Sequence, residues 1–139
     1  MSAVNLYNQY RQNAVATASP AQMGEMMYSG VVKFLKQAEG HLEQNDLQEA
    51  HNAIIKAQDI FEYMAETLNE KVDISFNLAL LYDYAYRRLI EANVTKDITI
   101  LREVLIMSEE LREAWQEARE SLANNVAAAP RSDNTNKLV

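Results

Sequence analysis

The chain has 139 residues, a net charge of −7, 48% hydrophobic residues and no cysteine. The charge argues against nucleic-acid binding, which depends on clustered Lys and Arg, and the lack of cysteine excludes disulfides and thiolate metal sites. No hydrophobic run approaches the roughly 20 residues of a membrane-spanning helix, so membrane insertion is not expected. Three glycines and two prolines leave few turns, and this composition favours an all-α fold.

Residues 1–18 are predicted to form a short N-terminal arm. Leu6, Tyr7 and Tyr10 suggest that the arm lies on the body of the protein, because tyrosine offers a large contact area with a polar tip. A frayed terminus is the alternative. The arm lacks the basic start and apolar core of a secretion signal, and the absence of cysteine fits a cytoplasmic protein.

A first helix is expected over residues 20–44. Ser19 can cap its free amides, and Pro20 at the first helical position loses no hydrogen bond that the helix needs. Gly24 and Gly30 weaken the helix by up to about 1 kcal/mol each, and the close approach of another backbone is one reason to keep them. One face of this helix carries its apolar residues, namely Met23, Met27, Val31, Phe34, Ala38 and Leu42.

Two more helices follow, over residues 47–68 and 72–94. Asp46 is a plausible cap for the first of them, with Glu49 three residues on as in a capping box. The second has apolar residues on most of its circumference, although Leu80 and Tyr84 face away from its main apolar side. This pattern fits either a well-buried bundle helix or a helix that offers part of its surface to a partner.

A fourth helix is expected over residues 97–124, with Asp97 as its cap. Its apolar side steps by three and four residues through Leu101, Val104, Ser108, Leu111, Trp115, Ala118 and Leu122. Residues 125–139 show no periodicity and are predicted to be a disordered tail. Short polar joints between long helices predict an antiparallel up-down four-helix bundle over residues 19–124.

Catalytic motifs are not apparent in the sequence. His41 and His51 flank the first interhelical turn and are able to share a metal, but the Glu-x-x-His pair of a metal-binding bundle is missing, so surface histidines are favoured. The sequence contains no phosphate-binding glycine loop and no nucleophile signature. We therefore expect a protein that is not an enzyme and needs no cofactor.

Several apolar residues lie off the main faces of their helices: Met26, Val32, Ile55, Tyr63, Leu80, Tyr84 and Ile106. A few exposed apolar residues need no explanation, but so many over all the helices would outline grooves for amphipathic segments of a partner. The alternative is that the assumed helix phases drift and that some of these residues belong to the core.

Short motifs occur in a fixed order along residues 5–120. They are Tyr10, Val15 and Thr17-Ala18-Ser19-Pro20; Met26-Met27-Tyr28 and Gly30; Phe34-Leu35; Ala57-Gln58-Asp59-Ile60; Leu81-Tyr82-Asp83-Tyr84 and Arg87-Arg88-Leu89-Ile90-Glu91-Ala92-Asn93; and Glu110-Leu111-Arg112-Glu113-Ala114-Trp115. In this order they resemble the flagellar secretion chaperone family FliS. The sequence departs from the family pattern at Ser29, where Asp is usual, and at Gly24, where a larger apolar residue is usual.

The resemblance implies a cytoplasmic export chaperone that binds the C-terminal segment of flagellin, prevents premature filament polymerisation and delivers flagellin to the gate of the flagellar type III secretion apparatus. It also implies that the N-terminal arm covers part of the binding surface when flagellin is absent, and that a homodimer can form. The alternative is a self-associating bundle or an adaptor for another flagellar protein. The residues expected to contact the client are Tyr7, Tyr10, Ile55, Leu80, Tyr84, Arg88 and Ile106.

Overall fold

The computed structural model describes the backbone of residues 20–69 and 73–137, and the side chains of residues 22–69 and 75–125. Within these ranges the regular elements are four helices. They are α2 (Pro20–Glu43), α3 (Leu47–Glu66), α4 (Asp73–Thr95) and α5 (Ile98–Lys137). The predicted starts and ends of the first three helices are confirmed to within two residues.

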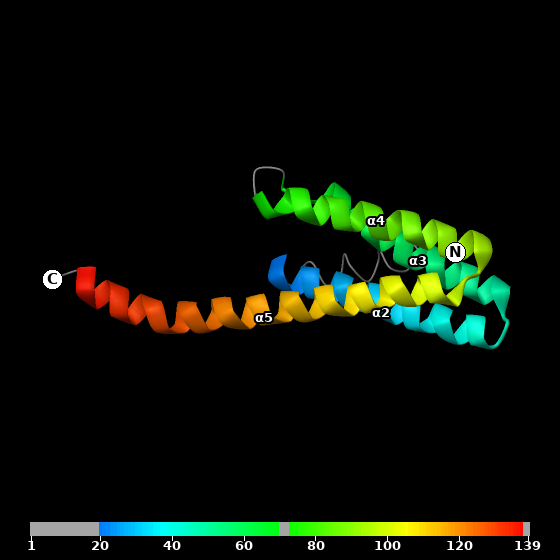
Figure 1. Ribbon diagram of the computed structural model, residues 1–139. Coiled ribbons are helices and arrows are strands. Elements are labelled where there is room, and N and C mark those ends of the chain that lie inside the picture. Colours follow the sequence, from blue (N-terminus) through cyan, green and yellow to red (C-terminus); the bar gives the residue numbers. More distant parts are fainter. Residues whose placement is uncertain (1–19, 70–72, 138–139) are drawn as a thin grey trace.

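Consecutive helices run in opposite directions, and each packs on its neighbours in the sequence (Figure 1). α5 returns to pack along α2, so that the four helices form a closed cycle of contacts. The predicted all-α antiparallel bundle is confirmed. The contact between α2 and α3 is the most extensive of the cycle, and the contact between α4 and α5 is the least extensive.

Two tight turns at the same end of the bundle follow from local chemistry. Asn45 (φ 58°) and Lys96 (φ 53°) adopt the left-handed conformation that reverses the chain after a helix. Asp46 then accepts a hydrogen bond from the N–H of Glu49, and Asp97 accepts one from the N–H of Thr99 at 2.8 Å. Both predicted caps are therefore confirmed, whereas Ser19 lies outside the described residues.

The core contains residues from all four helices. Its largest fully buried side chains are those of Phe61, Leu35, Ile54, Ile60, Leu89, Leu101, Val31, Val32 and Val104. The assignment of Val32 to an outward face was wrong, because only 2% of its surface is exposed. α2 packs on both α3 and α5, so its buried face is wider than a single stripe. Met26 and Tyr63 are half-buried.

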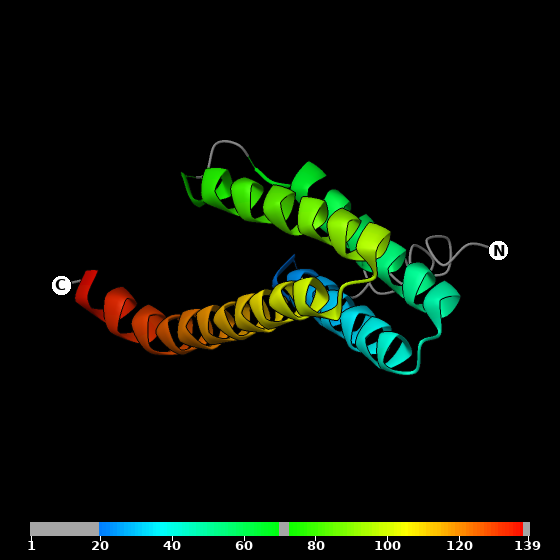
Figure 2. The same ribbon diagram turned by 45° about the vertical axis from the view of Figure 1, so that its right-hand side comes forward.

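α5 is longer than predicted, since its backbone continues from Ile98 to Lys137 instead of ending near residue 124. The sequence has neither glycine nor proline between Ile98 and Ala129, and the alanines near its end are strong helix formers. α5 extends past the ends of the other helices (Figures 1 and 2), so Ala118 and Leu122 of its apolar side are exposed. The predicted disorder of residues 125–139 and the predicted arm at 1–18 stay predictions.

In the part of the chain that the structure describes, no helical stretch combines the length and the apolar character that crossing a lipid bilayer requires.

Candidate functional site: an apolar cleft between α4 and α5

α4 and α5 lie close together at the turn that joins them and separate toward the beginning of α4 (Figures 1 and 2). The separation uncovers side chains that the helical pattern assigns to the core. Leu81 lies on the side of α4 that carries the buried Ala85 and Leu89, yet 39% of its surface is exposed. Leu78, on the same side, is only half-buried.

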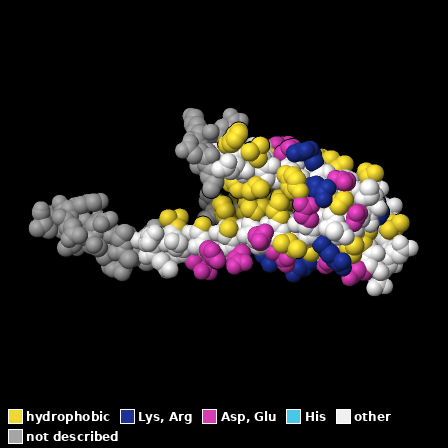
Figure 3. Space-filling view, in the orientation of Figure 1, with side chains coloured by type: hydrophobic (Ala, Val, Ile, Leu, Met, Phe, Trp, Pro, Cys, Tyr) yellow, Lys and Arg dark blue, Asp and Glu magenta, His cyan; other side chains and the backbone are white. Residues whose placement is uncertain are grey.

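The facing side of α5 is also apolar. Met107 and Leu111 follow Glu103 at one and two helical turns, and Glu103 contacts α4 directly. Both residues, together with Trp115, are half-buried and pack on the edge of the core. Figure 3 shows hydrophobic side chains gathered in the angle between the two helices. We refer to this surface, formed by Leu78, Leu81, Met107, Leu111 and Trp115, as the α4–α5 cleft.

An aromatic cluster forms the floor of the α4–α5 cleft. The hydroxyl oxygens of Tyr28 on α2 and Tyr82 on α4 share a hydrogen bond at 2.5 Å. Tyr28 also packs on the ring of Trp115, with centroids 5.8 Å apart, and Tyr82 packs on Phe61 at 6.0 Å. Burial raises the pKa of both tyrosines, so they stay neutral at physiological pH. The cluster therefore joins the four helices below the cleft.

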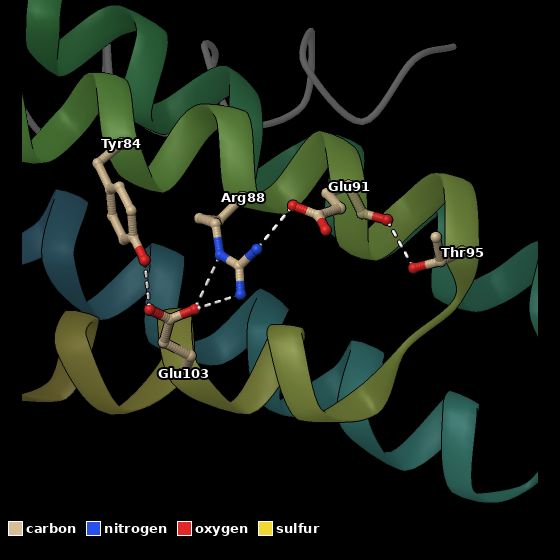
Figure 4. Close-up of polar contacts among 5 residues, drawn as sticks. All are labelled: Tyr84, Arg88, Glu91, Thr95 and Glu103. Atoms are coloured by element: carbon tan, nitrogen blue, oxygen red, sulfur yellow. Dashed lines mark hydrogen bonds and ion pairs between the residues drawn. The ribbon is translucent and has the colours of Figure 1, made fainter.

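A polar cluster holds the narrow end of the cleft together (Figure 4). The carboxylate of Glu103 accepts hydrogen bonds from the Tyr84 hydroxyl at 2.5 Å and from Arg88 Nε at 2.9 Å. Arg88 also pairs with Glu91 at 2.6 Å, and the backbone oxygen of Glu91 accepts a hydrogen bond from Thr95. The contacts of Glu103 with Tyr84 and Arg88 fix α4 to α5 on the side of the turn that joins the two helices, whereas the contacts of Glu91 lie within α4.

The pKa values in this cluster follow from the same contacts. Hydrogen bonds from Tyr84 and Arg88 lower the pKa of the Glu103 carboxyl below its ordinary value. The hydrogen bond to Glu103 raises the pKa of both Tyr84 and Arg88. At neutral pH the cluster is therefore an ion pair with a neutral phenol, and it provides a charged border to an otherwise apolar surface.

Four of the predicted contact residues lie along this side of the molecule. Leu80 and Ile106 are exposed, at 56% and 57%, and Tyr84 is exposed beside Glu103. Because α4 and α5 are antiparallel, Leu80 and Ile106 lie at the same level, about one turn beyond the bridge between Tyr84 and Glu103. Arg88 is half-buried and held by its two ion pairs.

The structure does not bring Ile55 to this cleft. Ile55 is on α3, one turn after His51, whose Nδ1 lies 2.9 Å from the side-chain nitrogen of Asn93 on α4. Ile90 precedes Asn93 by nearly one turn. Ile55 on α3 and Ile90 on α4 therefore both lie near the contact between His51 and Asn93, and both are exposed. With Leu47 and Val94, which are also exposed, they form a second strip that we call the α3–α4 strip.

The remaining predicted residues give no further site. Tyr7 and Tyr10 lie outside the described residues. His41 lies 3.8 Å from Asp46, whereas His51 hydrogen-bonds Asn93, so the two histidines have separate partners. Within residues 22–69 and 75–125, no three His, Asp or Glu side chains are placed to hold a metal ion.

Sequence reasoning missed Leu78, Leu81 and Met107 because their helical phase is that of core residues. It also missed Phe76, which is 70% exposed one turn before Leu80. One signal was available: residues 72–94 have apolar side chains around most of the helix, which is more than one packed face requires.

Comparison with known proteins gives a consistent result. Residues 3–122 match the family model described as flagellar protein FliS. The chain is 37% identical over 121 residues to the flagellar secretion chaperone FliS of Bacillus subtilis, a match that covers 87% of this chain and 91% of the relative. It is also 37% identical over 109 residues to the flagellar secretion chaperone FliS of Salmonella typhimurium, covering 76% of this chain and 81% of that relative.

A solved structure shares the fold. The crystal structure of a flagellar chaperone from bacteria matches with a TM-score of 0.69 at 22% sequence identity, covering 85% of this chain and 98% of that one. At this identity the likeness concerns the arrangement of the helices.

Proposed function

The chain belongs to the FliS family of flagellar proteins, and we propose that it is a cytoplasmic export chaperone for flagellin. In this proposal it binds the C-terminal segment of flagellin, prevents premature filament polymerisation and delivers flagellin to the flagellar type III secretion apparatus. The names of the curated relatives support the chaperone role, and the α4–α5 cleft supports the mode of binding.

The single observation that carries the binding mode is that core-phase side chains in the cleft are incompletely covered, with Leu81 exposed and Leu78 half-buried. Leu81 and Leu78 on α4 face Met107 and Leu111 on α5 across a gap that no helix among the described residues fills. An amphipathic helix of a client has the shape and the apolar face to enter such a gap. The charged border at Arg88 and Glu103 would orient its polar side.

The energetics suit a client that is disordered when free. Ordering such a segment costs on the order of 2–5 kcal/mol. At about 25 cal/mol per Å² of apolar surface, about 200 Å² of burial offsets the upper end of this cost, before the cost of association. A segment that follows the cleft and continues over the exposed side of α4 would bury several times that area.

The same burial explains how the chaperone would prevent polymerisation. A flagellin helix that joins a filament must present an apolar face, and free monomers would associate through it. While the face is buried in the cleft it is not accessible to another monomer. Because the contact is non-covalent and mostly apolar, we expect the export gate to release the client by competition.

Titration calorimetry with a peptide that covers the C-terminal segment of flagellin tests the proposal, with circular dichroism on the same mixture. We expect one-to-one binding, a negative heat-capacity change and a gain of helicity. No heat and no gain of helicity from a folded chain would refute the flagellin assignment. As a variant, Leu80→Ala with Tyr84→Ala should weaken binding while the bundle stays folded.

The α3–α4 strip favours a second candidate, self-association or binding of another flagellar protein. Leu47, Ile55, Ile90 and Val94 are exposed on one side of the bundle, away from the cleft. Light scattering over a range of concentrations, with and without the flagellin peptide, separates the candidates. A dimer through this strip would form without the peptide, and Ile90→Glu would abolish it.

A further inference from the structure

The α2 backbone at Gly24 lies directly against the indole ring of Trp115 on α5. A Cβ atom placed on Gly24 would overlap ring atoms Cζ2 and Cε2 and would lie 3.0 Å from Nε1. Such an overlap requires that the ring or one of the helices move. The indole can therefore occupy its place in this structure only because residue 24 has no side chain.

Neighbouring contacts make movement of the ring easier than movement of the helices. Glu25, next to Gly24, accepts a hydrogen bond from Gln116 at 3.1 Å and forms an ion pair with Arg119. These contacts, both with residues that follow Trp115, fix α2 to α5 beside the ring. A side chain at position 24 would therefore displace the indole from its place on α2.

The ring that would move is part of the proposed client site. Trp115 is half-buried at the end of the α4–α5 cleft, and its ring also packs on Tyr28, whose hydroxyl holds Tyr82 on the cleft floor. Displaced from α2, the indole would narrow the end of the α4–α5 cleft that it lines. The width of the cleft at this end thus depends on the position of the Trp115 indole.

We propose that Gly24 is a positioning residue for client recognition: it seats the Trp115 indole on the α2 backbone and so keeps the wide end of the α4–α5 cleft open for an apolar helical segment of the client. The inference rests on the proposed function for its client. The position of the Trp115 ring against α2 can be measured in the absence of the client.

Gly24→Ala and Gly40→Ala make a matched pair of variants. Both replace a glycine in α2, and both should favour the helix by a similar amount, up to about 1 kcal/mol. A Cβ on Gly40 meets nothing within 4 Å, whereas a Cβ on Gly24 overlaps Trp115. Only the first variant should therefore disturb the cleft.

Tryptophan fluorescence reports the environment of the indole ring, because Trp115 is the single tryptophan of the chain. We expect the emission of Gly24→Ala to shift relative to the wild type, since the indole leaves its contact with α2, and the emission of Gly40→Ala to stay unchanged. Identical emission from all three proteins would overturn the inference.

Calorimetry with the C-terminal flagellin peptide measures the effect on the client. We expect Gly24→Ala to bind about tenfold more weakly than the wild type, and Gly40→Ala to bind as the wild type does. In a Trp115→Leu background, Gly24→Ala should have little further effect, because the ring through which it acts is gone. An equal loss in both backgrounds would show that Gly24 acts by another route.

The two proposals fail in different ways. If the wild-type chain does not bind the peptide, the proposed function is wrong, and the role of Gly24 in client recognition is wrong with it. If the wild type and Gly24→Ala bind equally well while their emission differs, the proposed function stands and the inference is overturned.

Discussion

The α2–α3 hairpin and the α4–α5 pair share the same helical periodicity of apolar residues. The hairpin buries these residues, whereas the α4–α5 pair leaves some of them exposed. In the hairpin, Val31, Leu35, Ile54 and Phe61 are all fully buried. In the other pair, Leu81 has the phase of a core residue and is nevertheless exposed. The pattern of apolar residues thus determines which side of a helix turns inward, and the spacing of the neighbouring helix determines whether that side is closed or offered to a partner.

Buried small side chains favour close packing of the hairpin, although α4 also buries Ala85 and Ala92. Ala38, Ala50, Ala53 and Ala57 are buried in α2 and α3, and small residues allow helices to pack closely. α4 and α5 are instead joined at one end by the side chains of Tyr84, Arg88 and Glu103. Beyond this polar cluster the two helices separate, and the separation creates the cleft.

The largest expected effect on stability comes from truncating a core side chain of the α2–α3 hairpin, which is the closed half of the molecule. Phe61→Ala removes a fully buried ring that also packs on Tyr82, and it should lower the free energy of unfolding by about 3–5 kcal/mol. Thermal and urea denaturation measure the loss. A loss below about 0.5 kcal/mol, the size typical of surface positions, would show that the α2–α3 hairpin is not firmly packed around Phe61.

Leu81→Ala should affect peptide binding more than stability. Because Leu81 is already partly exposed, its truncation should change the melting temperature little, but it should weaken binding of the flagellin peptide about tenfold. Leu122→Ala is a matched control, since Leu122 is exposed on α5 beyond the cleft. A large drop in melting temperature without a change in affinity would make Leu81 an ordinary core residue.

Gln58 offers a way to stabilise the closed half further. It is buried in α3, and its Oε1 has no hydrogen-bond partner among the described residues. Replacing an unsatisfied polar group with an apolar one of similar size removes a desolvation cost, so Gln58→Met should raise the free energy of unfolding by about 1 kcal/mol. Urea denaturation checks this, and a destabilised variant would mean that the amide oxygen is satisfied in solution.

The smallest effect concerns the polar cluster at the narrow end of the cleft. The folded pKa of Glu103 lies below the ordinary 4.5, so its contacts stabilise the fold above that pH and are lost as the pH falls through the folded value. A carboxyl titration by NMR should give a midpoint for Glu103 below 4.5.

Glu103→Gln tests whether these contacts contribute to stability. The melting temperature of the variant should lie slightly below that of the wild type at pH 7, and the two should converge in acid. A constant difference at every pH would assign the effect to lost packing instead of lost charge.

Local features of this structure could be predicted from the sequence, because they depend on neighbouring residues. Asp46 and Asp97 end their turns as expected, and three of the four helices have the expected bounds. The helical pattern also identified Leu80 and Ile106 as outward residues, and both are exposed. Val32 was misjudged because the pattern of one helix does not show how many neighbours it has.

The cleft could not be predicted, since it depends on contacts between residues far apart in the sequence. The hydrogen bond that joins Tyr28 to Tyr82 spans 54 residues, and Gly24 meets Trp115 from another helix. These contacts hold α4 and α5 against α2, and the spacing between α4 and α5 decides whether Leu81 is covered. The glycines of α2 suggested the close approach of another backbone, whereas the structure brings the side-chain ring of Trp115 to Gly24.

Hydrogen–deuterium exchange of the chain, alone and with the C-terminal flagellin peptide, tests most directly whether the open half holds the client. We expect the peptide to slow exchange in residues 75–85 of α4 and 103–115 of α5, and to change it little in the closed hairpin of α2 and α3. Slower exchange confined to the α3–α4 strip, with the cleft unchanged, would contradict the account and place the client on the other side of α4.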